Sequence, residues 1–235
     1  MAEAAGRIDN FTDAAFAFAV SLLVIGGAGA PADFNALARA LADIPAFAFG
    51  FAIVVLFWFA HVRWRRLRGE GDWRSLFLTL LLVFLVLIYI QPLRAMAAAT
   101  SAFFTGQGGG FRGNAADLFA VYGTGFVLMS ATLAGLFADA RRNPELSPAD
   151  RSRADGEVAI WLIHAATGLV SILLSLTRFG PFAALVYSTL PVSIGLYLRR
   201  RRRSATNAEQ PQSGLDPVSS GPAGGQVSGT SPSAG

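Results

Sequence analysis

A carboxylate stands at the beginning of the first hydrophobic stretch of the sequence. Residues 7–25 read "RIDNFTDAAFAFAVSLLVI", and after Asp13 almost every side chain is a hydrocarbon. If this stretch enters a membrane, a carboxylate costs about 2.5–3.5 kcal/mol at the bilayer centre and less near the surface, and such residues usually have a partner. We therefore expect Asp13 to accept a hydrogen bond or form an ion pair with another helix.

The best donors for Asp13 follow in the second hydrophobic stretch, where "FWFAH" ends at His61. If the first helix enters the membrane from the cytoplasm near residue 11 and the second returns near residue 62, these segments lie at similar depth. Trp58 offers an indole N–H, His61 a ring N–H one turn away on the same face, and Arg7 can fold back to the same place. We expect these three residues to cluster around Asp13. Taken singly, they also fit an interfacial tryptophan, a histidine that reaches water, and a helix cap at Thr12 or Asp13.

Membrane-spanning helices must position these polar residues. Of the 235 residues, 53% are hydrophobic and 14% are charged, a balance that is typical of an integral membrane protein. A spanning helix needs about 20 mainly apolar residues. The sequence therefore predicts an all-α integral membrane bundle of six transmembrane helices, at about residues 11–30, 44–62, 75–97, 115–138, 157–176 and 180–198.

The charge distribution orients this bundle. With a cytoplasmic N-terminus, most of the nineteen basic residues, all arginines, fall in cytoplasmic segments. This bias predicts that both termini are cytoplasmic, and it explains the arginine clusters without a nucleic-acid or phosphoinositide site. We expect a transmembrane domain over residues 1–203 and a disordered cytoplasmic tail over 204–235, which is rich in Gly, Pro and Ser. The outer segments would hold only Arg39, Arg94, Arg112 and Arg178.

Other classes of protein fit the sequence less well. It has no cysteine and only two histidines, so we expect no metal site and no cofactor. His164 and Ser171 would share a helix face but lie about 10 Å apart along it, too far for a base and its nucleophile, so we do not expect an enzyme. A secondary transporter stays the alternative, although the only helix breakers in its favour are Pro92 and Pro191. A purely structural membrane protein is also open, and acidic residues before the first stretch disfavour a cleaved signal peptide.

Two motifs carry a more specific resemblance. The first stretch contains R-x-x-x-F-[S/T]-D and the second contains W-x-x-H, and together they resemble the signature of the transmembrane-protein-175 family of potassium channels, which are lysosomal in animals and also occur in bacteria. The resemblance covers about residues 6–200. It implies a hydrogen-bond network between the first two helices, in which Thr12 replaces the commoner serine and keeps the hydroxyl. The residues that it assigns to this network are Arg7, Thr12, Asp13, Trp58 and His61.

The helical period gives the first helix a second face. Asp13 and Phe18 are five residues, or about 500°, apart, so they point in directions that differ by about 140°. The family resemblance implies that the stripe opposite Asp13 lines the ion pathway and that its apolar side chains form the constriction. Phe18 departs from the aliphatic residue that is usual there, and Ser21 stands where relatives often have threonine. The constriction residues carried over by position are Phe18, Ser21, Leu22 and Ile25.

These features predict a potassium-selective or potassium-permeable cation channel. No T-V-G-Y-G filter is present, and "YGTGF" at 122–126 is better explained by close helix packing. A narrow hydrophobic collar can gate instead by dewetting. Because the first motif occurs once, one chain supplies one lining helix, and the resemblance implies a homotetramer. We expect a multi-pass protein of a bacterial plasma membrane whose partners are potassium ions, the lipid bilayer and its own copies, with no nucleic acid.

Overall fold

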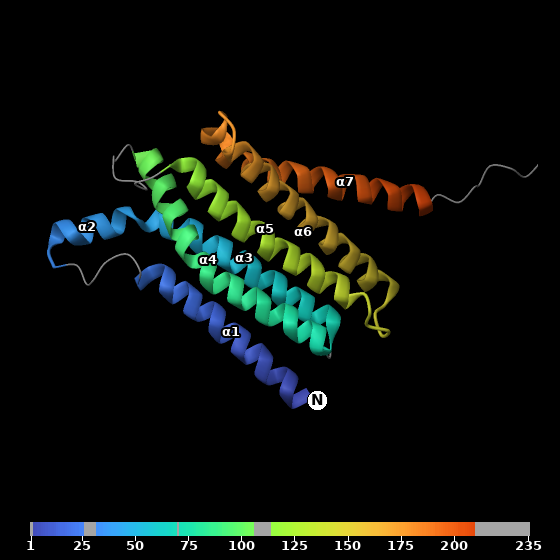
Figure 1. Ribbon diagram of the computed structural model, residues 1–235. Coiled ribbons are helices and arrows are strands. Elements are labelled where there is room, and N and C mark those ends of the chain that lie inside the picture. The colour runs from blue at the N-terminus through green and yellow to red at the C-terminus, as the bar shows by residue number, and fades with distance from the viewer. Residues whose placement is uncertain (1, 26–31, 70, 106–113, 210–235) are drawn as a thin grey trace, which may run out of the picture. The chain divides into compact units, whose positions relative to one another are not determined.

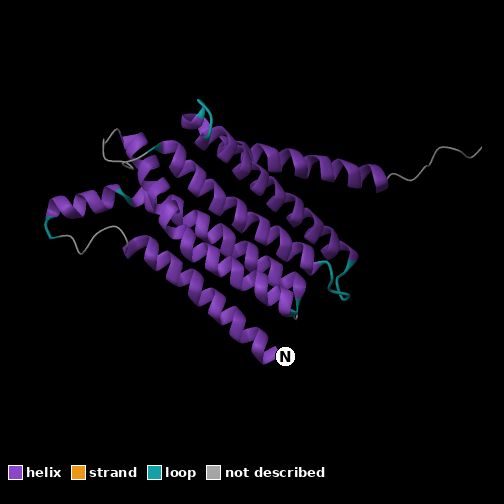
Figure 2. Ribbon diagram, in the orientation of Figure 1, coloured by secondary structure: helices purple, strands orange, loops and turns teal. Residues whose placement is uncertain are grey.

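The described part of the chain is helical almost throughout. The computed structural model describes residues 2–25, 32–69, 71–105 and 114–209, and every regular element in these ranges is a helix. The all-α prediction is therefore confirmed for the described residues (Figures 1 and 2). The elements are α1 (Ala2–Ile25), α2 (Phe34–Ala42), α3 (Ile44–Arg68), α4 (Trp73–Thr105), α5 (Ala115–Ala140), α6 (Pro148–Ser175), the 3₁₀ helix η1 (Gly180–Thr189) and α7 (Leu190–Glu209).

Four of these helices are long and apolar enough to cross a membrane. They correspond to the second to fifth predicted spans. Helix α1 covers residues 11–25 of the first predicted span, and residues 26–30 of that span lie outside the described residues. The four spanning segments are Ile44–Arg68, Trp73–Ala99, Ala116–Ala140 and Pro148–Ser175.

The sixth predicted span differs from expectation, because it is not one continuous α-helix. Residues Gly180–Thr189 form the 3₁₀ helix η1, and an α-helix begins only at Leu190. Pro191 has no N–H to donate to a preceding turn, so it ends the earlier segment, whereas in the first turn of α7 the missing donor costs nothing.

Residues 1–195 form one compact unit and residues 196–235 a second. Within the second unit α7 continues to Glu209, past the predicted start of the tail at 204, and residues 210–235 lie outside the described residues.

Helices α5 and α6 make the most extensive contact in the bundle. Two glycines allow their close approach. A Cβ atom at Gly123 would lie 2.7 Å from Ile172 Cγ1, and one at Gly168 would lie 2.7 Å from Val127 Cγ2. Gly125 packs directly against the ring of Tyr89 on α4. The "YGTGF" segment is thus a helix-packing segment, as its small residues predicted.

Aromatic side chains from three helices form the centre of the core. Phe57 of α3 lies 5.9 Å from Phe126 of α5 and 5.4 Å from Trp161 of α6, measured between ring centroids. All three are almost fully buried. Large buried aromatic rings contribute strongly to packing energy, so this group holds α3, α5 and α6 in a fixed arrangement.

Helix α1 lies at one side of this core and packs against α3 and α4 (Figure 1). Its buried residues Thr12, Phe16, Ala19 and Leu23 recur every three or four positions, which places them on one stripe. The opposite side of α1 faces away from its own bundle. This orientation determines which residues of α1 can contact lipid or another protein chain.

Candidate functional site

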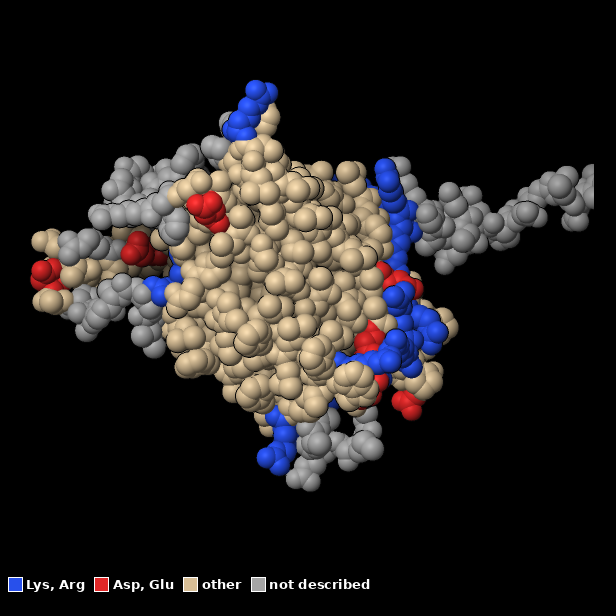
Figure 3. Space-filling view, viewed as in Figure 1, with Lys and Arg blue, Asp and Glu red and all other residues tan. Residues whose placement is uncertain are grey.

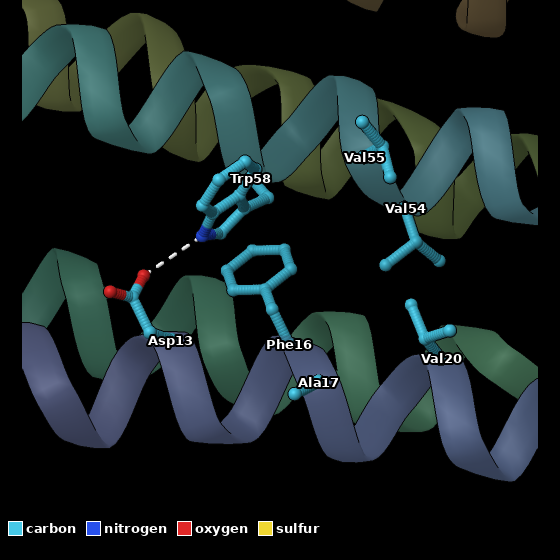
Figure 4. A pocket seen from close by; sticks show the side chains of 7 residues that line it. All are labelled: Asp13, Phe16, Ala17, Val20, Val54, Val55 and Trp58. Carbon is cyan, nitrogen blue, oxygen red and sulfur yellow. Dashed lines mark hydrogen bonds between the residues drawn. The ribbon is translucent and has the colours of Figure 1, made fainter.

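Asp13 and Trp58 join α1 to α3. The indole Nε1–H of Trp58 donates to Asp13 Oδ1 at 2.8 Å (Figure 4). Both residues belong to the lining of an apolar cavity of about 270 Å³, together with Phe16, Ala17, Val20, Val54 and Val55. The Asp13 carboxylate is thus placed at a mainly hydrocarbon surface and receives a strong donor there, as the cost of a carboxylate in a membrane requires.

A second contact between the same helices lies closer to the N-terminus of α1. Arg65 Nε donates to both carboxylate oxygens of Asp9, at 2.8 and 3.0 Å. Asp9 and Asp13 are four residues apart on α1, while Trp58 and Arg65 are seven apart on α3, so each pair lies on one helix face. Because the two helices run in opposite directions, the two contacts form successive rungs of one ladder. The sequence analysis missed Asp9 and Arg65, although these spacings could have indicated them.

Arg7 does not join the cluster, contrary to the prediction. It is exposed, and within the described residues the donors to Asp13 and Asp9 are Trp58 and Arg65 instead. Six residues separate it from Asp13, which is about 600° of helix and points its side chain about 120° away from the carboxylate. Arg65 of α3 supplies the guanidinium between these helices instead.

His61 and Thr12 also have other partners than expected. His61 is buried, with Nε2 3.4 Å from Thr79 Oγ1 of α4 and its ring 5.1 Å from that of Trp64. Thr12 is buried, and its hydroxyl donates to the carbonyl oxygen of Ile8 at 2.9 Å, within its own helix. Of the five predicted network residues, the structure therefore brings Asp13 and Trp58 into direct contact, and it turns His61 towards α4.

The predicted constriction residues divide between two environments. Phe18 is 57% exposed, and Ser21 is exposed with its hydroxyl bonded to the carbonyl oxygen of Ala17 at 3.1 Å. Leu22 is half-buried and packs against the core, because it lies beside the buried stripe of α1. Ile25 ends the helix, and its side chain lies outside the described residues. Ala19, one residue from Phe18, is fully buried and belongs to the packing face.

A second polar cluster, which the sequence analysis missed, lies where α3 ends. Asp139 of α5 has a buried carboxylate whose Oδ2 accepts from Arg68 Nε at 2.9 Å and from Ser75 Oγ at 2.7 Å. A carboxylate near a helix C-terminus is disfavoured by the helix dipole, so these donors are needed there. Asp72, in the loop before α4, accepts from the backbone N–H of Ser75, which lowers the pKa of this aspartate.

Further ion pairs surround this end of the bundle. Arg63 of α3 lies 3.2 Å from Glu157 of α6, and Arg141 lies 3.0 Å from Asp155. Helix α1 begins, α3 ends, and α4 begins at this arginine-rich end, and Figure 3 shows the basic side chains gathered there. Several of these arginines therefore act as contacts between helices.

His164 and Ser171 do not form a catalytic pair. His164 Nδ1 lies 2.8 Å from the carbonyl oxygen of Ile160, and Ser171 Oγ donates to the carbonyl oxygen of Ala183 at 3.0 Å. Each side chain is thus bonded to backbone, which is a structural role. Among the described residues, no three His, Asp or Glu side chains gather in a way that could hold a metal ion.

Comparison with known proteins agrees with the two motifs. Residues 7–90 match the family described as the endosomal/lysosomal potassium channel TMEM175. A potassium channel from Marivirga tractuosa is 32% identical over 100 residues, which are 43% of this chain and 40% of that protein. The chain therefore aligns with less than half of that relative's length. The resemblance inferred from the motifs is confirmed.

The fold has a counterpart among solved structures. The crystal structure of the potassium channel MtTMEM175, as a T38A variant bound to a nanobody–MBP fusion, superposes with a TM-score of 0.73. The match covers 84% of this chain and 93% of that chain at 22% sequence identity. At this identity the similarity establishes the fold, that of a helical membrane bundle.

Proposed function

We propose that this chain is a potassium-permeable cation channel. Residues 7–90, which match the family of the potassium channel TMEM175, support the proposal. The observation that carries this proposal is the division of α1 into two faces. One stripe is packed against α3 and α4, and the opposite stripe, with Phe18 and Ser21, is not covered by the described residues of its own subunit. A helix with this division suits the wall of a pore between several subunits.

One chain supplies one such helix, so the pore requires several copies. We propose a homotetramer in the plasma membrane with both termini in the cytoplasm, in which the α1 helices surround the axis. The strong arginine bias towards one end of the bundle supports this orientation. Native mass spectrometry in mild detergent should give four subunits, and a monomer that conducts would contradict the assembly.

The constriction in this proposal is a collar of apolar side chains. Phe18, Leu22 and Ile25 fall at intervals of four and three residues and span about 10 Å of helix. A collar of this kind stops ions by excluding water from the narrow part of the pore. Leu22 is half-buried in a single subunit. It can therefore line the collar in one of two ways: α1 rotates slightly about its axis, or only the exposed part of the Leu22 side chain faces the pore.

Ion flux in liposomes tests the function directly. The purified full chain, reconstituted into potassium-loaded vesicles, should let potassium pass down its gradient without any second solute. Vesicles without protein set the background leak. Flux that depends on a coupled solute would indicate a secondary transporter, and flux equal to the background would contradict the proposal.

A further inference from the structure

The cavity between α1 and α3 combines hydrocarbon walls with one charged residue. Phe16 and Val20 of α1 and Val54 and Val55 of α3 supply apolar walls, and the carboxylate of Asp13 lies at one end (Figure 4). The cavity volume of about 270 Å³ is almost twice that of an engineered apolar cavity of about 150 Å³ that binds benzene. The cavity is therefore large enough for a small organic molecule.

The contact with Trp58 does not neutralise the charge of Asp13. The indole N–H is an uncharged donor, and it bonds to Oδ1 at 2.8 Å. Figure 4 shows the second carboxylate oxygen pointing away from the indole. The guanidinium of Arg65 is bonded to Asp9, and the Asp13 side chain is exposed in the subunit. A carboxylate at a hydrocarbon surface favours a charged partner, so this end of the cavity suits a cation.

The walls of the cavity favour an organic cation over a metal ion. An inorganic cation needs several oxygen atoms to replace its hydration shell. Apart from Asp13, the side chains that line the cavity are hydrocarbon or, at Trp58, an indole ring. An ammonium group is attracted by the face of such a ring as well as by a carboxylate. The lining therefore matches an ammonium group that carries an apolar body.

The direction of the cavity matches that of an amphiphile in a membrane. Helix α1 begins at the arginine-rich end of the bundle, so Asp13 lies nearer to that end than Val20 does. Seven residues of helix, or about 10 Å, separate the two positions. The charged end of the cavity is thus near one membrane surface, and the apolar end is deeper in the same leaflet. A single-chain amine in that leaflet has the same orientation.

We infer that this cavity binds a small amphiphilic amine. Its ammonium group forms an ion pair with Asp13 beside the ring of Trp58, and its apolar tail lies along Val20 and Val54. The inference does not depend on ion conduction, because it concerns only the contact of α1 with α3 within one subunit.

Photolabelling of the full chain tests this site. The probe is octylamine with a diazirine at the far end of its chain, added to the purified protein in a non-ionic maltoside detergent. It should label α1 near Val20 and α3 near Val54, and unlabelled octylamine should compete. The octanol probe with the same diazirine is the uncharged control and should label these positions at least severalfold less. Equal labelling by the two probes would show a groove for any hydrocarbon chain and would overturn the inference.

The variant Asp13→Asn separates the charge from the fold. Its side-chain oxygen still accepts the hydrogen bond from Trp58, so the unfolding temperature should stay close to that of the wild type. Labelling by the amine should fall at least severalfold, to the level of the octanol probe. Unchanged labelling would contradict the ion pair. Displacement of the probe by potassium chloride as effectively as by octylamine would indicate an inorganic cation and would overturn the inference as well.

A change in the wall tests whether the tail lies in the cavity. Ala17 is exposed and lines the cavity, so Ala17→Leu fills part of it and should reduce labelling by the amine at least severalfold. The matched control is Ala14→Leu, because Ala14 is also exposed but lies about 60° further around α1. This control should label like the wild type. Equal labelling of both variants, or no labelling of the wild type, would show that the amine does not occupy this cavity.

Discussion

At the scale of single residues, the contact of Asp13 with Trp58 is the first one to test. Asp13→Ala removes the only acceptor that the Trp58 indole has in the described residues and should lower the free energy of unfolding by about 0.5–1.5 kcal/mol. Asp13→Asn should cost less, since its side-chain oxygen still accepts the hydrogen bond. Thermal unfolding in detergent measures both.

The control for this experiment is Arg7→Gln, because Arg7 is exposed. It should unfold like the wild type. The double variant with Trp58→Phe should cost less than the sum of the single changes, because both remove the same hydrogen bond. An Asp13→Ala protein with wild-type unfolding temperature and tetramer yield would show that the contact contributes nothing.

The two arginines Arg68 and Arg63 give a second comparison. Arg68→Gln leaves the buried carboxylate of Asp139 without its closest cation, and the loss of one partner of a buried pair costs about 3 kcal/mol or more. Arg63→Gln breaks a pair whose arginine is about half exposed, which contributes about 0–1 kcal/mol. The unfolding temperature of Arg68→Gln should be clearly lower than that of Arg63→Gln. Equal unfolding temperatures would contradict the role assigned to Asp139.

The sequence could predict part of these contacts. The partner of Asp13 followed from the depth of Trp58 in an antiparallel helix. The choice between Arg7 and Arg65 depends on how α1 is rotated about its axis, and burial of Thr12, Phe16, Ala19 and Leu23 sets that rotation. Hydrophobic residues surround α1 on almost every side, so its packing stripe could not be identified without the neighbouring helices.

At the scale of helices, the contact of α5 with α6 depends on small residues. Gly168→Ala adds a Cβ that would lie 2.7 Å from Val127 Cγ2 and 3.3 Å from Phe126 Cδ1. Overpacking of this kind costs about 1–3 kcal/mol, more than the roughly 1 kcal/mol that alanine gains over glycine within a helix. We expect Gly168→Ala to lower the unfolding temperature.

Gly135→Ala is the matched control in α5. Its Cβ would lie 3.8 Å from Leu78, an ordinary contact, so only the gain in helix propensity remains. The two substitutions should therefore change the unfolding temperature in opposite directions. A stabilising effect of Gly168→Ala would show that the two helices can separate at little cost.

Hydropathy predicted where the helices lie, but it did not predict where a helix is interrupted. The second to fifth spans were found because each is a long apolar run. The final span was predicted as one helix, since residues 180–198 are equally apolar, but Pro191 falls where a continuous ladder would need its N–H. A proline in a membrane segment can be tolerated as a kink or can end the helix, and hydropathy does not distinguish these outcomes.

At the scale of the whole molecule, the exposed stripe of α1 should control ion passage. In a four-fold assembly, Phe18 places four aromatic rings around the axis, a larger obstruction than four aliphatic side chains. Phe18→Ala should raise the basal potassium flux in liposomes and reduce the preference for potassium over sodium, because wider collars admit ions with more of their water. Folding should be little affected, since Phe18 is 57% exposed within one subunit.

The matched control for this prediction is Phe84→Ala, which removes a similarly exposed aromatic side chain from α4. Phe84 lies on a helix that we do not place at the axis, so this variant should keep wild-type flux and selectivity. If both variants behaved like the wild type, Phe18 would contact lipid or a neighbouring helix and the pore would have another wall. If both variants raised the potassium flux equally, the increase would indicate that the helix bundle as a whole is less tightly packed. Only an effect confined to Phe18 connects the open face of α1 with the ion pathway, because burial, helix propensity and side-chain size are matched between the two positions.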